Sequence, residues 1–259
     1  NWNGWQDTIE CLESVFKLSY PNYSVVVVDN GSSNDSIEKI GTWAISDASK
    51  SLKIIETGKN LGYAGGNNVG LRYVMELNDY DYVWLLNNDT VVDPNALSQL
   101  VLRIREKPGA GLCGSIIMSY HDRTKISAIG GGWYDRWFGQ AVHPGADKLY
   151  DPARADKYLK MERKINYIDG ASTLVSREFL QNVGLMNEEY FLFFEEIDWA
   201  RRGRKHFSLA IAPKSLVYHK GSASVRRKEQ EDQLKGKHFS LLFDYYNTRN
   251  RLLFTHKYF

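Results

Sequence analysis

The apolar run at residues 82–86 constrains the fold of this chain more than any other segment. Its sequence, Tyr-Val-Trp-Leu-Leu, contains no charged residue, so it predicts a strand that is buried on both faces. Strands of this kind form the sheets of α/β proteins, in which ligands bind at the carboxyl ends of the strands. The run ends in three polar residues, Asn87, Asn88 and Asp89. The Asp89 carboxylate could hold a hard cation or a ribose hydroxyl, or it could only cap the next helix.

Strand-like and helix-like segments alternate through the first half of the chain. Short apolar or β-branched runs occur at residues 25–28, 52–56 and 111–118. Helical spacing of apolar residues occurs in four segments. The first is 5–18, the second follows a cap at Ser33 or Asn34 and ends near residue 46, the third is 66–78, and the fourth has Pro94 near its first turn and ends near residue 106. This order predicts an α/β fold with a mostly parallel central sheet flanked by helices.

The second half is less regular. Between residues 119 and 165, a Gly-Gly-Gly-Trp sequence and many aromatic residues favour β-hairpins or an ordered loop. The later pattern predicts a strand at 166–175, helices at 177–183 and 195–205, and strands at 207–212 and 215–218. A tail from residue 230 to 259 is predicted to be an amphipathic helix. We therefore expect a main domain at 1–225 and a helical tail at 226–259.

Composition limits the classes of partner and compartment. The chain has 259 residues and a formal net charge of +2, which gives no argument for nucleic-acid binding. Basic residues cluster at 201–206 and 226–228, and each cluster is either a solvated face or a surface for phosphate or anionic lipid. Cys11 and Cys113 lack metal-ligand spacing and fit a reducing compartment, so we expect a cytoplasmic protein. No segment reads as a membrane span or signal peptide.

Two polar loops could bind a nucleotide. Asp29 ends the run at 25–28 and is followed by Asn30-Gly31-Ser32, where glycine lets the backbone turn and approach a ligand closely. Its carboxylate could accept a hydrogen bond from a uracil or thymine imide or from ribose, or it could form a helix-capping turn. The loop at 58–68 is rich in glycine, and its Asn60 and Asn67 could bind a nucleotide. Its glycine spacing fits neither a dinucleotide fingerprint nor a P-loop.

Three carboxylates, Glu195, Glu196 and Asp198, follow the aromatic residues at 191–194. An apolar environment raises the pKa of a carboxylate, which suits a general base that works near neutral pH. On a helix Glu195 and Asp198 would share a face and Glu196 would point elsewhere. The alternative is a set of acidic residues stabilised at a helix N-terminus. His219 ends an apolar run and could be structural, or it could complete a hard-metal site with Asp89 and diphosphate oxygens.

In this order the segments resemble the family-2 glycosyltransferases of the GT-A fold, and in particular their rhamnosyltransferase-like branch. The resemblance covers nearly the whole chain. It implies that a nucleotide sugar contacts two segments. The first contains Asp29, Gly31 and Ser32, and the second is the loop Asn60-Leu61-Gly62-Tyr63-Ala64-Gly65-Gly66-Asn67. Asn87 and Asn88 would lie beside it, and Gly170-Ala171 would face the sugar and acceptor. The tail sequence Tyr245-Tyr246-x-x-Arg249-Asn250 is also similar to this branch.

The resemblance also implies roles for the acidic residues. Asp89 and His219 would hold Mg²⁺ or Mn²⁺, and the pair Glu195-Glu196 would supply the base, with Glu196 as the base itself. The chain departs from the family pattern in having Asn87 and Glu196 where an aspartate is usual. The strand that precedes the position of Asn1 in this fold is not in the sequence. We therefore expect either that a partner fills its place or that the chain folds poorly.

We therefore expect an inverting, metal-dependent transfer of a sugar from a nucleoside diphosphate sugar to a hydroxyl. Deoxythymidine diphosphate-rhamnose is the donor that the resemblance favours. The acceptor would be a lipid-linked or polymeric glycan precursor of a cell-envelope polysaccharide, at the inner face of the membrane. Two alternatives stay open: a sugar-phosphate nucleotidyltransferase, and a non-catalytic relative that binds nucleotides or glycans.

Overall fold

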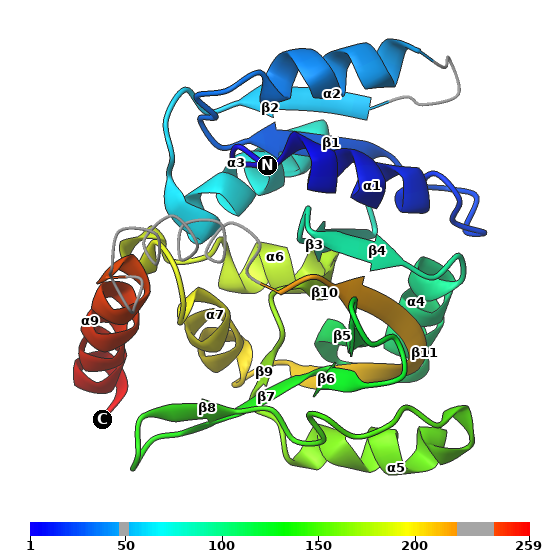
Figure 1. Cartoon of the computed structure of the whole chain (residues 1–259). Helices are drawn as coiled ribbons and strands as arrows, with labels where there is room; N and C mark the ends of the chain where they lie inside the picture. Colours follow the sequence, from blue (N-terminus) through cyan, green and yellow to red (C-terminus); the bar gives the residue numbers. More distant parts are fainter. Residues whose placement is uncertain (47–51, 222–240) are drawn as a thin grey trace.

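Helices lie on both sides of a sheet that is divided into two parts (Figure 1). The structure, a computed structural model, describes residues 1–46, 52–221 and 241–259. The smaller part pairs β1 (Val25–Asp29) with β2 (Leu52–Glu56) in parallel. The larger part has the strand order β3-β10-β5-β6-β7-β8, and β11 pairs with both β5 and β4. Its strands are β3 (Tyr82–Leu86), β4 (Thr90–Val92), β5 (Ala110–Ser119), β6 (Ile126–Ile129), β7 (Gly131–Asp135), β8 (Gln140–Val142), β9 (Tyr167–Ile168), β10 (Ser172–Ser176) and β11 (Ser208–His219).

The predicted α/β fold with a central sheet is confirmed, but the sheet is mixed rather than mostly parallel. β10 lies between β3 and β5 and is antiparallel to both. β11 is parallel to β5 and antiparallel to β4. The flanking helices are α1 (Trp5–Val15), α2 (Ser36–Ile45), α3 (Gly62–Leu77), α4 (Ala96–Glu106), α5 (Ala155–Lys160), α6 (Arg177–Val183), α7 (Glu195–Gly203) and α9 (Leu241–Tyr258).

Three predicted boundaries differ from the structure. Helix α3 begins at Gly62 rather than residue 66, so the glycine-rich loop forms its first turn. The strand predicted at 166–175 is two strands, β9 and β10, separated by the turn at 169–171. The two strands predicted at 207–212 and 215–218 are one strand, β11, whose register shifts between Ala212 and Leu216. A β-bulge of this kind lets one strand continue past a local irregularity.

The main hydrophobic core holds α7 in place. Ile197 and Trp199 of α7 pack with Phe179 of α6 and with Phe254 of α9 in one buried cluster. The Trp199 indole also donates a hydrogen bond to the carbonyl of Gly184 at 2.8 Å. The acidic residues at the start of α7 are therefore carried by a helix that is anchored on several sides.

The tail helix is present, but a single apolar stripe is not. α9 begins at Leu241, and the helix start predicted at residue 230 and the basic cluster at 226–228 lie outside the described residues. Phe254 is buried against the domain, whereas Leu252 is 67 % exposed. The exposed apolar side chains also include Leu242, Phe243, Tyr245 and Leu253. Apolar side chains of α9 are therefore both buried against the domain and exposed, which corrects the expectation of a single apolar stripe.

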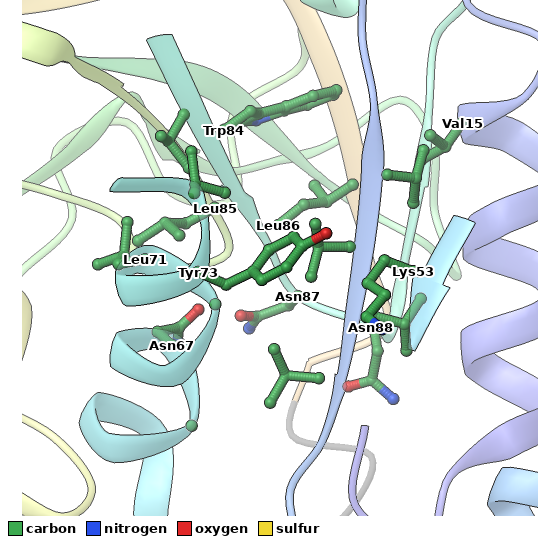
Figure 2. A pocket seen from close by; sticks show the side chains of 18 of the residues that line it. Val15, Lys53, Asn67, Leu71, Tyr73, Trp84, Leu85, Leu86, Asn87 and Asn88 are labelled. Atoms are coloured by element: carbon green, nitrogen blue, oxygen red, sulfur yellow. The ribbon is translucent and has the colours of Figure 1, made fainter. Parts of the chain in front are cut away.

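A cavity of about 1490 Å³ separates the two parts of the sheet (Figure 2). Residues 25–28 of β1 line one side, and residues 82–86 of β3 line the other. Within the described residues, β1 pairs only with β2 and β3 pairs only with β10, so each has one unpaired edge facing this cavity.

Candidate active site

The Asp29 carboxylate organises the first polar loop. Asp29 is buried at the end of β1, and its Oδ1 accepts a hydrogen bond from the Ser32 amide at 2.8 Å. Its Oδ2 accepts hydrogen bonds from the Ser32 hydroxyl and the Asn1 side chain, both at 2.7 Å. Gly31 has φ +75°, and a Cβ there would clash with the backbone of Lys59. Asp29 thus closes a local turn but does not cap a helix, because α2 begins at Ser36 with Asp35 at its N-cap. Nucleoside binding by Asp29, Gly31 and Ser32 stays a prediction.

Asn30, which was not predicted as a site residue, joins the two predicted nucleotide loops. Its Nδ2 donates to Asn60 Oδ1 at 3.2 Å and to the carbonyl of Gly62 at 2.9 Å. Its Oδ1 accepts from the Leu61 amide at 3.0 Å. Asn60 Oδ1 in turn accepts from the Gly62 amide at 2.8 Å. The sequence feature that could have indicated Asn30 is its position beside Asp29 in a polar run. Its pairing with a loop thirty residues away depends on the pairing of β1 with β2.

The first turn of α3 connects this loop to the acidic segment. Gly62 has φ +74°, and a Cβ on it would clash with Phe191. The Tyr63 amide donates to the carbonyl of Phe191 at 2.6 Å, and the Tyr63 hydroxyl donates to the carbonyl of Gly170 at 2.6 Å. Gly66 lies against the Asn30 side chain. The Asn67 side-chain Nδ2 donates within its own helix, to the carbonyl of Tyr63 at 2.9 Å.

The polar residues after β3 meet the turn at 169–171. The Asn87 amide donates to the carbonyl of Ala171 at 3.1 Å, which brings Gly170 and Ala171 to the carboxyl end of β3 as expected. Asn88 Nδ2 donates to the Thr8 hydroxyl at 2.9 Å. The predicted residues 60–67, 87–89 and 170–171 are therefore neighbours, although long stretches of sequence separate them.

Asp89 and His219 form the predicted pair. Because His219 of β11 is in register with Thr90 of β4, its Nε2 lies 3.1 Å from Asp89 Oδ1. A carboxylate oxygen suits Mg²⁺ or Mn²⁺, and the neighbouring imidazole could add a nitrogen ligand. Across the described ranges no group of three acidic, histidine or cysteine residues is arranged to hold a metal. Two protein ligands need further oxygens from a bound diphosphate, which is a common arrangement for Mg²⁺.

Glu195 and Glu196 begin α7 in an apolar setting. For each of them, Oε2 is buried and has no hydrogen-bond partner among the residues that the structure describes. Burial raises the pKa of Glu196 to about 7, and the charge of nearby Asp169 adds to the effect. Burial also raises the pKa of Glu195 well above its ordinary value, with a contribution from the Glu196 charge. A carboxyl group whose pKa is near 7 can accept a proton at neutral pH.

Asp198 has the opposite environment. Burial would raise its pKa, but hydrogen bonds from Lys257, Tyr258 and Arg202 outweigh burial and lower it. The donor atoms lie 2.8, 2.6 and 2.8 Å from its oxygens. Its predicted part in catalysis stays a prediction, and its contacts are those of a residue that joins α7 to α9.

Asp169 was not predicted from the sequence. It immediately precedes Gly170 and interrupts an otherwise apolar stretch, which was the available signal. Its Oδ1 accepts from the Ala171 amide at 2.9 Å, and its Oδ2 lies 3.8 Å from His143 Nδ1. It therefore brings a negative charge near Glu196.

The family model of glycosyl transferase family 2 matches residues 1–184. The chain belongs to this family. Among curated relatives, the low-salt glycan biosynthesis hexosyltransferase Agl10 of Haloferax volcanii is 25 % identical over 70 % of this chain and 53 % of that protein. The N-acetylglucosaminyl-diphospho-decaprenol L-rhamnosyltransferase of Mycobacterium tuberculosis is 24 % identical over 79 % of this chain and 68 % of that protein. This glycosyltransferase chain thus spans about half the length of the archaeal relative.

Solved structures support the GT-A fold. A mannosyltransferase from Pyrobaculum calidifontis, in complex with GDP-Man and Mn²⁺, has a TM-score of 0.61 and 15 % identity, over 92 % of this chain and 60 % of that one. GalNAc-T7 with UDP, GalNAc and Mn²⁺ has a TM-score of 0.64 and 17 % identity, over 83 % of this chain and 41 % of that one. The predicted family and fold are confirmed.

Proposed function

We propose that this glycosyltransferase moves a sugar from a nucleoside diphosphate donor to a hydroxyl acceptor with inversion at the anomeric carbon. The observation that carries the proposal is Glu196, a carboxylate with a pKa near 7 and a buried oxygen without a partner in the described part of the chain. In the proposed step, Glu196 accepts the proton of the acceptor hydroxyl while that oxygen attacks the anomeric carbon. The bond to the diphosphate breaks, and the diphosphate leaves with its electron pair.

Asp89 and His219 would hold the divalent cation, either Mg²⁺ or Mn²⁺. A bound cation would neutralise charge on the leaving diphosphate. The 3.1 Å approach of the two side chains places their ligand atoms together, and the adjacent Asn87 and Asn88 could contact the donor. The nucleotide would contact residues of the two polar loops, namely Asp29, Gly31, Ser32, Asn60, Gly62, Tyr63, Gly66 and Asn67. The sugar and acceptor would contact Gly170 and Ala171.

Deoxythymidine diphosphate-rhamnose is the donor we favour, since relatives of this chain include a rhamnosyltransferase. The acceptor would be a lipid-linked or polymeric glycan precursor of the cell envelope. Leu242 on α9 is partly exposed and would contact a membrane surface. Within the part of the chain that the structure describes, no helix has the length and apolar character of a membrane span. Co-sedimentation with anionic liposomes tests the contact, and Leu242→Asp should weaken it.

The first test is turnover with a panel of nucleotide sugars in the presence of Mn²⁺, preceded by a thermal-shift screen for donors. Sugar transfer to a hydroxyl supports the proposal. Formation of nucleotide sugar from sugar phosphate would instead identify a nucleotidyltransferase. Donor binding without turnover would identify a non-catalytic relative.

Asp89→Ala tests the metal assignment. We expect the fold to remain, the Mn²⁺ dependence of nucleoside diphosphate affinity to disappear, and kcat to fall about 10²–10³-fold, the usual effect of losing a group that stabilises developing charge. Calorimetric titration with and without Mn²⁺ measures the affinity. A variant with unchanged metal dependence would show that Asp89 is not a ligand.

A further inference from the structure

Asn250 of α9 is fully buried against the loop at residues 190–194, which leads into α7 (Figure 1). Its Nδ2 donates to three carbonyl oxygens of that loop, those of Tyr190 at 2.7 Å, Leu192 at 2.8 Å and Phe193 at 2.9 Å. An amide nitrogen carries two N–H groups, so the three acceptors share them. Backbone carbonyls in a buried loop need donors, and here one side chain of the tail helix supplies them.

Arg249 sets the orientation of the Asn250 amide. Its Nη1 donates to Asn250 Oδ1 at 3.1 Å and to the carbonyl of Glu189 at 2.8 Å. The side-chain oxygen of Asn250 therefore faces a cation, and the nitrogen faces carbonyl oxygens. The reversed orientation would place Oδ1 against three acceptors and Nδ2 against a donor, so the network allows only one arrangement.

The loop has a backbone conformation that needs support from its surroundings. Phe191, Phe193 and Phe194 have φ values of +61°, +68° and +77°. Residues with a Cβ adopt this region only where the surrounding structure enforces it. Phe191 also stacks on Tyr246 of α9, with ring centroids 4.7 Å apart. Helix α9 thus holds the loop through both its backbone and a side chain.

The acidic residues of α7 follow this loop without a spacer. The helix begins at Glu195, and the carbonyl of Phe194 accepts its first hydrogen bond, from the Asp198 amide at 2.8 Å. A hydrogen bond from the Phe193 backbone to the Glu195 carboxylate opposes the rise in pKa that burial causes. A shift of the loop would therefore move Glu195 and the adjacent Glu196 with it.

The loop also contacts the first turn of α3. The Phe191 carbonyl accepts a hydrogen bond from the Tyr63 amide at 2.6 Å, and Gly62 has no room for a Cβ beside Phe191. The Tyr63 hydroxyl donates to the carbonyl of Gly170 at 2.6 Å. Burial and the nearby charge of Glu196 raise the pKa of Tyr63. The loop conformation therefore sets where Glu196 lies relative to Tyr63 and Gly170.

We infer that Asn250 positions the Glu195–Glu196 segment by holding the loop at 190–194, an inference that rests on the proposed function of Glu196. Asn250 contacts neither donor nor acceptor in this assignment and acts only through the loop. Helix α9 is then a support of the active site. If Asn250 served only to pack the tail helix on the domain, its loss would reduce stability and leave the reaction rate of the folded protein unchanged.

Two substitutions remove the N–H donors of Asn250 in different ways. Asn250→Asp keeps the size of the side chain, and Asn250→Ala removes the donors without adding a charge, so one variant can replace the other if folding fails. The matched controls are Asn247→Asp and Asn247→Ala, the same changes three residues earlier on α9 at a half-buried position. Asn250→Gln, which retains the donors, is the conservative variant.

Asn250→Asp and Asn250→Ala should each lower kcat about 10²-fold, the usual result of misplacing a reacting group by about 1 Å. The KM for the donor should change much less, because the proposed donor contacts at Asp29 and Asp89 lie outside this loop. Asn250→Gln should recover part of kcat, and both Asn247 variants should match the parent protein. Folded Asn250 variants with the parent kcat, even with a lower melting temperature, would overturn the inference.

A double variant tests whether the effect passes through Glu196. Once Glu196→Gln has removed the base, the position of that side chain matters little, so adding Asn250→Ala should lower kcat by less than about threefold further. If the two losses instead multiply, Asn250 acts through another group, and the inference is wrong.

Hydrogen exchange gives a readout that needs no sugar transfer. The amides of residues 190–196, and the Tyr63 amide bonded to Phe191, should exchange at least about tenfold faster in Asn250→Ala and at the parent rate in Asn247→Ala. If the parent protein transfers no sugar from any donor, the proposed function fails, and exchange still decides whether Asn250 holds the loop. Unchanged exchange in a folded Asn250→Ala or Asn250→Asp protein would overturn the inference whatever the transfer assay shows.

Discussion

The first turn of α7 carries buried carboxylates with opposite environments. Asp198 receives hydrogen bonds from Arg202, Lys257 and Tyr258, and its pKa is lowered despite burial. The Oε2 atoms of Glu195 and Glu196 are buried without a partner in the described ranges, and the pKa values of both groups are raised. A buried carboxylate oxygen without a partner reduces stability, and groups of this kind cluster at active sites. We propose that Glu195 and Glu196 serve chemistry, whereas Asp198 joins the helix to α9.

Glu196→Gln should give the largest effect on turnover. We expect kcat to fall about 10²–10⁴-fold, the usual loss when a positioned general base is removed. Donor affinity should change little, because binding needs no base. Steady-state kinetics and calorimetric titration with the donor measure the two quantities. Near-normal turnover in Glu196→Gln, with loss in Glu195→Gln or Asp198→Asn, would assign the base to another carboxylate, and normal turnover in all three would make the segment structural.

Asp198→Asn should mainly reduce stability. Removing one partner of a buried ion pair typically costs about 3–5 kcal/mol, and we expect the lower end since Lys257 is 41 % exposed. The free energy of unfolding from denaturant titration is the measurement. At a temperature where the variant is folded, its kcat should remain within about tenfold of the parent value. A stable Asp198→Asn protein with much lower kcat would remove the distinction between Asp198 and the two glutamates.

The two environments predict opposite dependences of stability on pH. The raised pKa of Glu196 means that its contribution is present below about pH 4.5 and is lost as pH rises through about 7. The lowered pKa of Asp198 means that its contribution is present above its unfolded-state value and is lost as pH falls through its folded-state value. The decline of the unfolding free energy at high pH should therefore be smaller in Glu196→Gln, and the decline at low pH should be smaller in Asp198→Asn, when both are measured from pH 3 to pH 8.

Catalysis gives a related pH test. Since Glu196 must be ionised to accept a proton, kcat should fall about tenfold per unit as pH drops below about 7. The pH–rate profile of the parent protein measures this limb. A limb near the ordinary glutamate value would show that the reacting carboxylate is not desolvated.

Glu195→Gln should have the smallest effect. Because burial raises the pKa of Glu195 well above the ordinary value, the protonated form is favoured, and glutamine closely resembles that form. We expect kcat and the melting temperature to stay close to those of the parent, with kcat changed less than about tenfold. Kinetics and melting curves on the same preparation check this. A loss as large as that of Glu196→Gln would show that the two glutamates act together.

The sequence predicted the parts of the site that depend on local pattern. Apolar runs predicted strands β1, β2, β3 and β5, and polar residues at strand ends located residues 29–32 and 87–89. The aromatic run before Glu195 predicted raised pKa values for Glu195 and Glu196, which the structure has. The Asp89–His219 pair was proposed from a strand end and a lone histidine, and the two side chains do meet.

Long-range pairing decided what the local pattern could not. Three contacts join segments that are distant in sequence. β10 lies antiparallel between β3 and β5, Asn30 donates a hydrogen bond to Asn60, and Asn250 donates hydrogen bonds to the loop at 190–193. Asp198 had the same apolar neighbours in sequence as Glu196, yet α9 supplies it with Lys257 and Tyr258. The chain's own sequence therefore determined which residues are polar at strand ends and which helices and strands form. Only tertiary packing decided which buried carboxylates find partners, since solvation and hydrogen bonding depend on side chains brought from elsewhere in the fold.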